Sequence, residues 1–168
     1  MDELNRGVPF SALSADQRDS FYPLPVPLLV RFERGACVYK WTSHTTLVKS
    51  SKGYFTEYWS AWDSFRIGDR TIEGFKEFRT RHNNLGGNVG RTQAAARALS
   101  AVTEQWNGMR SILKAEFLKP VWGFVGKIKY QRKFDDPDHP AEQSNVVLIG
   151  GAYQVLIPNL TEEWIRKL

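Results

Sequence analysis

Segments with the composition of β-strands lie toward the two ends of the chain, and segments with helical periodicity lie between them. Residues 28–42 and 120–157 are rich in β-branched and aromatic residues. Residues 71–82 carry apolar side chains at three-residue spacing. Residues 91–117 begin with dense alanine and predict a helix that Asn107-Gly108 can end or kink. Strands segregated from helices are typical of an α+β fold. We therefore expect a single α+β domain with a split, strand-rich core and helices in the middle of the chain.

Length and composition fit one such domain. A chain of 168 residues buries roughly 70% of the surface that its unfolded form exposes, and 42% hydrophobic residues supply a core. We place the domain at residues 28–168. Residues 1–27 form an N-terminal segment in which Ser14 can begin a short helix, and the prolines of residues 22–27 then force the chain to extend.

The charge of the chain leaves nucleic-acid binding open without favouring it. A net charge of +5 suits a polyanion, but the basic residues are scattered along the sequence. Their densest group, residues 127–133, is typical of a solvated strand edge protected by lysines.

Several other classes of protein lack support in the sequence. The single Cys37 excludes an internal disulfide and a zinc site with two thiolates. The three histidines are far apart, and residues 135–138 lack the glycine and the distant glutamate of a calcium loop, so we expect no metal. There is no 18-residue apolar run and no signal-peptide pattern. We expect a protein made in the cytoplasm that does not enter a membrane.

One polar residue stands out in the C-terminal stretch "GGAYQVLIPNL", residues 150–160. In a strand, Tyr153, Val155 and Ile157 share one face, and Gln154 shares the other with Ala152 and Leu156. Gln154 therefore either pairs inside a half-buried face or faces a site.

The segment 118–160 resembles the end of NAD-consuming toxin domains in the ADP-ribosyltransferase superfamily. The residues that carry the resemblance are "KPVWGFVGKIKYQ", followed by a loop and by "GGAYQVLIPNL". The strongest similarity is to bacterial NAD glycohydrolase toxins of the tuberculosis necrotizing toxin type, where glutamine replaces the catalytic glutamate of the transferases. The Ser-Thr-Ser strand of the transferases has no counterpart here.

The resemblance implies roles for particular residues. Gln154 would hold a ribose hydroxyl while the nicotinamide bond breaks, and because an amide cannot act as a general base, it favours attack by water. Arg31 would bind the pyrophosphate through paired hydrogen bonds. Further candidates for contacts with the dinucleotide are Arg34, whose position has the opposite parity to that of Arg31, the aromatic residues Tyr54, Phe55 and Trp59, Gly151, and the weaker candidates Arg91 and Gln131.

The sequence thus leads to the hypothesis of an NAD glycohydrolase toxin or effector domain that uses NAD or NADP as substrate and needs no other cofactor. A cognate immunity protein and delivery by a dedicated secretion system are the expected companions of such an activity. Two alternatives stay open: a mono-ADP-ribosyltransferase that modifies a protein or nucleic acid, and a nucleic-acid-binding domain without enzymatic activity.

Overall fold

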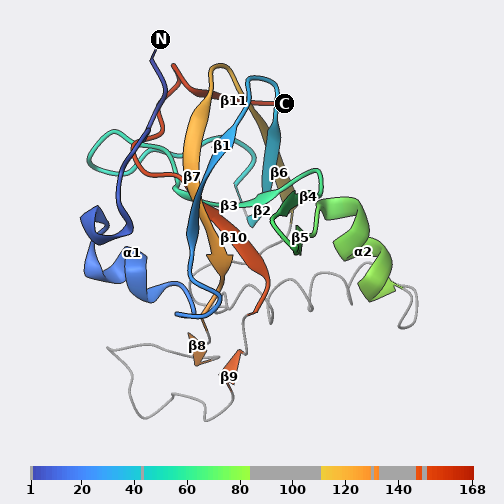
Figure 1. Cartoon of the computed structure of the whole chain (residues 1–168). Coiled ribbons are helices and arrows are strands. Elements are labelled where there is room, and N and C mark those ends of the chain that lie inside the picture. Colours follow the sequence, from blue (N-terminus) through green and yellow to red (C-terminus); the bar gives the residue numbers. More distant parts are fainter. Residues whose placement is uncertain (1, 43, 84–110, 130, 133–146, 149–150) are drawn as a thin grey trace, which may run out of the picture.

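The structure, a computed structural model, describes residues 2–42, 44–83, 111–129, 131–132, 147–148 and 151–168. Within these residues the chain is a single, strand-rich α+β body, as the sequence predicts (Figure 1). Its main sheet has seven antiparallel strands in the order β1-β7-β10-β3-β2-β6-β11.

The strands of the main sheet are β1 (Leu28–Phe32), β2 (Cys37–Thr42), β3 (Tyr58–Ala61), β6 (Ser111–Phe117), β7 (Val121–Lys127), β10 (Tyr153–Leu156) and β11 (Ile165–Lys167). Two small ribbons accompany it, formed by β4 (Phe65–Ile67) with β5 (Arg70–Ile72) and by β8 (Gln131–Arg132) with β9 (Val147–Leu148). The helices are α1 (Ala15–Asp19), α2 (Phe75–Asn83) and the short 3-10 turn η1 (Phe10–Ala12).

Strand β3 divides the main sheet into two sections because it changes partner halfway along. Tyr58 and Trp59 pair with β10, whereas Ser60 and Ala61 pair with β2. One section therefore contains β1, β7 and β10, and the other contains β2, β6 and β11, and the two share only this four-residue strand. A cleft lies where the sections separate.

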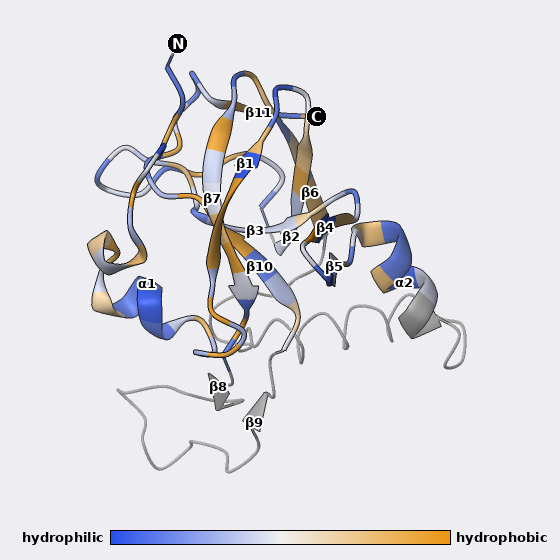
Figure 2. Ribbon diagram, in the orientation of Figure 1, coloured by the Kyte–Doolittle hydropathy of each residue, from blue (hydrophilic) through white to orange (hydrophobic). Residues whose placement is uncertain are grey.

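The main core lies on one face of the sheet and contains residues from both sections. Alternate residues supply it, among them Phe32, Val125 and Val155 from one section and Val38 and Phe117 from the other. Figure 2 shows the apolar colouring along much of β1 and β7 and the hydrophilic colouring of α1.

The N-terminal segment covers the opposite face of the β1–β7–β10 section. Leu13 and Phe21 pack there with Phe124 and Leu156 in a second, smaller core. Leu4 forms a bridge with Val121. The Ser14 hydroxyl accepts the Gln17 N–H, and the Gln17 side chain accepts the Ser14 N–H, so the short helix begins at the predicted residue with a capping box.

The prediction that the helices lie in the middle of the chain is wrong in part. Helix α1 lies near the N-terminus, and residues 111–117, the end of the predicted 91–117 helix, form strand β6. Leu113, Ala115 and Phe117 alternate into the core, and β6 pairs with both β2 and β11, so pairing in the sheet outweighs local helix propensity. Residues 91–110 lie outside the described part of the chain.

Two boundaries also differ from the sequence prediction. Helix α2 begins at Phe75 instead of near Thr71, because Arg70–Ile72 pairs with β4 as strand β5. The last residues, predicted as a helical turn, contain strand β11 paired with β6. A turn at Gly35 (φ +87°) joins β1 to β2 as expected, although the two strands belong to different sections and do not pair.

Candidate functional site

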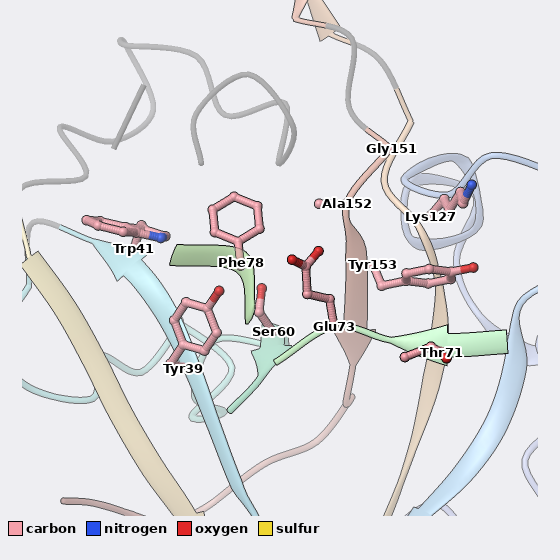
Figure 3. A pocket seen from close by; sticks show the side chains of 10 residues that line it. All are labelled: Tyr39, Trp41, Ser60, Thr71, Glu73, Phe78, Lys127, Gly151, Ala152 and Tyr153. Carbon is pink, nitrogen blue, oxygen red and sulfur yellow. The ribbon is translucent and has the colours of Figure 1, made fainter. Parts of the chain in front are cut away.

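A cleft opens between the two sections of the sheet (Figure 3). Its volume is about 200 Å³, which is smaller than the roughly 300–1,000 Å³ of sites that enclose a whole small molecule. Within the described residues, three parts of the chain line it: the β2–β3 wall, the β7–β10 wall, and the segment that leads from β5 into α2. The described lining residues are Tyr39, Trp41, Ser60, Thr71, Glu73, Phe78, Lys127, Gly151, Ala152 and Tyr153.

Strand alternation places the rings of the β2 wall. Val38 points into the main core, so Tyr39 and Trp41 lie on the other face and reach the cleft. The Tyr39 ring packs edge-on against Trp62 and Phe75, at centroid distances of 5.8 and 5.0 Å. Burial raises the pKa of the Tyr39 phenol, and so does the charge of Glu73, whereas a hydrogen bond with Ser60 opposes the shift. Tyr39 is therefore a neutral phenol within the field of the Glu73 carboxylate.

The β7–β10 wall is fixed by main-chain hydrogen bonds. The Gly151 N–H donates to the Ile128 carbonyl at 2.8 Å, and the Ile128 N–H donates to the Ala152 carbonyl at 2.9 Å. Gly151 has a φ of +93°, which favours glycine over any other residue. The Lys127 ammonium lies 5.7 Å from the centroid of the Tyr153 ring.

Glu73 reaches the cleft because the chain leaves β5 and turns directly into α2. The turn passes so close to a neighbouring loop that a Cβ atom on Gly74 would lie 2.6 Å from the Trp62 carbonyl oxygen. The Phe75 N–H donates to that same carbonyl at 2.9 Å, and buried Phe78 anchors the helix. In Figure 3 the Glu73 carboxylate lies between the rings of Tyr39, Trp41 and Phe78 on one side and Tyr153 on the other.

Gln154 lies on the other face of β10 from Tyr153 and does not line the cleft. Its side chain is 5% exposed, and its Nε2 donates to the Ser20 hydroxyl at 3.0 Å and to the Ser20 carbonyl at 3.3 Å. This is the arrangement of a polar residue satisfied within a buried face. A catalytic role for Gln154 stays a prediction.

Arg31 is held by carboxylates. Its guanidinium donates to Glu3 at 2.8 and 3.0 Å and forms a second ion pair with Glu33. The Trp122 indole also donates to Glu3, at 2.7 Å. Hydrogen bonds from Arg31 and Trp122 hold the pKa of Glu3 at about 2.

Arg31 and Gln154 lie on the same face of the sheet, but the strands keep them apart. Arg31 pairs across β7 with Trp122, whereas Gln154 pairs with Gly126. Those two partners are four positions apart, which is about 13 Å along a strand. The structure thus does not bring the two predicted catalytic residues together.

The remaining candidates have different environments. Arg34 is exposed in the turn between β1 and β2, and Tyr54 is 40% exposed. Phe55 packs against the main core, and Trp59 is fully inside it, with its indole N–H donating to the Thr56 carbonyl at 2.9 Å. Among the predicted residues that the structure describes, Gly151 lines the cleft. Arg91 and the side chain of Gln131 lie outside the described part of the chain.

Sequence reasoning missed the aromatic and acidic residues of the cleft. Two signals were present: Tyr39 and Trp41 have the same parity in "CVYKWT", and Glu73 is an acid placed directly between a strand and a helix. Both signals are local, and neither reveals that these segments meet β10.

The cleft combines a carboxylate with the hydroxyl groups of Tyr39, Ser60, Thr71 and Tyr153 and with several rings, a set suited to a sugar carrying an aromatic base. No group of three or more metal-ligating side chains occurs within the residues that the structure describes. In the same residues, no helix is both long and apolar enough to cross a membrane.

Comparisons of the chain with protein-family models, with curated proteins and with solved structures give no significant match.

Proposed function

We propose that the chain is an NAD glycohydrolase of ADP-ribosyltransferase-like fold whose active site is the cleft between β10 and the β2–β3 wall. The observation that carries this proposal is the position of the Glu73 carboxylate in an aromatic cleft whose opposite wall begins at Gly151. Gly151 belongs to the Gly-Gly-x-x-Gln stretch on which the family resemblance rests. The division of the sheet at β3 adds support, because a split core accompanies that resemblance.

The proposed reaction has a simple balance. The bond between the nicotinamide nitrogen and ribose C1′ breaks, and its electron pair stays on the nitrogen, so nicotinamide leaves as a neutral molecule. The ribose carries the positive charge until water attacks C1′ and releases a proton, giving ADP-ribose. The ribose is neutral in the ground state and carries positive charge in the transition state. A carboxylate beside the sugar therefore stabilises the transition state more than the ground state.

The residues of the cleft divide these tasks. Glu73 faces the developing cation and accepts a proton from the attacking water. Tyr39 and Ser60 offer hydroxyl groups to the ribose, and the rings of Trp41 and Phe78 cover the nicotinamide. The cleft volume of about 200 Å³ suits the nicotinamide end, with the rest of the dinucleotide extending outside.

Gln154 acts as a positioning residue in this proposal. Its hydrogen bonds to Ser20 tie β10 to the N-terminal segment, and the three residues before it, Gly151, Ala152 and Tyr153, line the cleft. Loss of the amide would therefore displace the residues of the cleft wall and affect the reaction only through them.

Transfer of ADP-ribose to a macromolecule is a second candidate function. It is favoured by Glu73, because a carboxylate can take the proton of an acceptor hydroxyl or amine as readily as that of water. With either activity, we propose that a partner protein occludes the cleft in the cell that makes the domain.

The experiment is to incubate the purified chain with adenine-labelled NAD and to measure nicotinamide, ADP-ribose and macromolecule-bound label. Hydrolysis predicts equal amounts of the two free products, whereas transfer predicts label on protein or nucleic acid. Glu73→Gln should lower the rate roughly 100-fold or more, and Arg31→Ala and Gln154→Ala should lower it less. Intact NAD with every acceptor tried would refute both functions, and a larger loss in Arg31→Ala than in Glu73→Gln would refute the cleft as the active site.

A further inference from the structure

The connection between α1 and β1 exposes apolar side chains (Figure 1). Residues 20–30 contain no charged side chain. Leu24 is 75% exposed, Val26 54% and Leu28 37%, and these three residues are called the apolar row below. Connecting loops ordinarily present polar groups to water, and apolar side chains gathered on a surface mark a place of interaction.

The loop that carries the apolar row is fixed against β7. The Tyr22 N–H donates to the Lys127 carbonyl at 2.8 Å. A Cβ atom on Gly126 would lie 2.8 Å from the Phe21 ring and 3.0 Å from Pro27, so both residues pack directly on that glycine. The loop is held by its buried residues, and the exposure of the apolar row is a property of the fold.

The backbone of the loop suits an apolar environment. Pro23, Pro25 and Pro27 have no N–H, and the Val26 carbonyl accepts a hydrogen bond from the Arg70 guanidinium at 3.4 Å. Unpaired main-chain groups oppose entry into hydrocarbon, and the prolines and this bond reduce their number. The same prolines oppose the addition of a strand from another protein, because one edge of the loop offers no donors.

Cationic side chains flank the apolar row. Arg70 contacts the loop at Val26, and Lys127 follows the glycine on which Pro27 packs. Within the described part of the chain, neither cation forms an ion pair. Asp69, next to Arg70 in the sequence, offsets part of this charge, but the whole chain carries +5. Apolar side chains beside cations fit a surface that is apolar beneath a layer of negative charge.

We propose that the apolar row docks on bilayers that contain anionic lipids. Leu24 and Val26 enter the boundary between head groups and acyl chains, and Arg70 and Lys127 lie among the head groups. A bilayer fits better than another protein, because it needs no strand pairing and accepts a projecting side chain without a matching pocket. This docking requires no membrane-spanning segment and does not depend on the proposed function. Lys127 also lines the cleft, so the cleft would lie near the membrane surface.

The test is cosedimentation of the full chain with vesicles of phosphatidylcholine alone or with about 30% phosphatidylserine. We expect the chain to bind the anionic vesicles at least roughly tenfold more tightly, and we expect this binding to weaken as salt is added. The double variant Leu24→Ser/Val26→Ser should bind them at least roughly tenfold more weakly, because two apolar side chains no longer leave water. Val48→Ser removes an exposed apolar side chain elsewhere and should bind like the wild type.

The cationic part of the surface has its own variant. Arg70→Gln should bind the anionic vesicles about fivefold more weakly, whereas Lys52→Gln, at an exposed position, should bind like the wild type. Melting temperatures are measured for every variant, and Leu24→Ser alone replaces the double variant if the latter melts early.

Equal binding to the two kinds of vesicle, or no binding to either, would overturn the proposal. Unchanged binding by the serine variant would also overturn it. Sedimentation velocity without lipid tests a rival occupant, a second copy of the chain. A wild-type dimer that dissociates in the serine variant would show that the apolar row joins two copies, which again contradicts docking on lipid.

Discussion

The amide of Gln154 donates a 3.0 Å hydrogen bond to the hydroxyl of Ser20, and this contact joins the central strand β10 to the N-terminal segment 134 positions earlier in the chain. The Ser20 hydroxyl in turn donates to the Gln17 carbonyl at 2.6 Å. The amide nitrogen of a polar residue in the middle of an apolar strand is thereby paired within the protein. The N-terminal segment is thus a structural part of the sheet that forms the cleft.

Ser20→Ala tests this contact. The substitution leaves the Gln154 amide with the Ser20 carbonyl at 3.3 Å as its remaining acceptor in the described structure. Because an incompletely satisfied buried donor costs free energy, we expect the free energy of unfolding to fall by about 1–2 kcal/mol. Urea denaturation measures this, with exposed Ser51→Ala as the control. Equal stability of the two variants would show that the hydroxyl contributes nothing.

Glu3 predicts a pH dependence of stability. Arg31 and Trp122 hold its folded-state pKa at about 2, well below the ordinary value of 4.5. As the pH falls below 4.5, the unfolded chain takes up a proton that folded Glu3 does not, so this part of the stability is lost progressively down to about pH 2.

Glu3→Gln should therefore have a lower urea midpoint than the wild type above pH 5, and the gap should close as the pH approaches 2. Glu163→Gln, at an exposed ion pair, is the matched control. A gap that stays constant from pH 7 to pH 2 would contradict the assignment.

Lys40 predicts a second pH dependence of stability, at alkaline pH. Burial lowers the pKa of Lys40 to about 8, while its Nζ donates to the Thr56 hydroxyl at 2.8 Å. Below pH 8 the folded state carries the full cost of the buried charge. From pH 8 to about 10.5 the folded lysine loses its proton before the unfolded one does, so stability rises with pH.

Lys40→Met should thus stabilise the chain by about 1–3 kcal/mol at pH 7, and the gain should shrink toward pH 10.5. Thermal unfolding at a series of pH values measures it, with exposed Lys52→Met as the control. Destabilisation by Lys40→Met at pH 7 would show that the Thr56 hydrogen bond outweighs the desolvation of the charge.

Gly74 controls the position of Glu73. An alanine Cβ there would lie 2.6 Å from main-chain atoms of Trp62 and Ser64, and neither can move aside as a side chain could. We expect Gly74→Ala to cost about 1–3 kcal/mol of stability and to displace the carboxylate from the cleft, which circular dichroism melting and nicotinamide release would detect together. Exposed Lys76→Ala, on the same helix, should change neither quantity.

The sequence predicted those parts of the fold that depend on local pattern. The Ser14 cap, the turn at Gly35 and the strands around Val30 and Val155 follow from residue type and alternation, and the structure confirms them. Residues 111–117 were mistaken for a helix because their sheet partners, β2 and β11, are distant in sequence.

The cleft was harder to predict for the same reason. Tyr39, Glu73 and Ala152 become neighbours through the change of partner at β3, which no local window shows. The family resemblance directed attention to Gln154 and Arg31, whose side chains are engaged by the N-terminal segment. Gly151 was found because the resemblance covers the strand that forms the cleft wall.

The measurement that tests the central claim most directly is the rate of nicotinamide release from NAD by the wild-type chain and by Ala152→Phe, which fills the cleft from the β10 wall. Ser51→Phe, at an exposed position, controls for the added ring. Glu73→Gln adds no bulk, so a loss of activity in this variant does not come from a side chain that disturbs the packing. We predict release by the wild type and by Ser51→Phe and a loss of at least roughly 100-fold in the other two variants. Wild-type rates in Ala152→Phe and Glu73→Gln, or no release by the wild type, would contradict the assignment of NAD cleavage to this cleft.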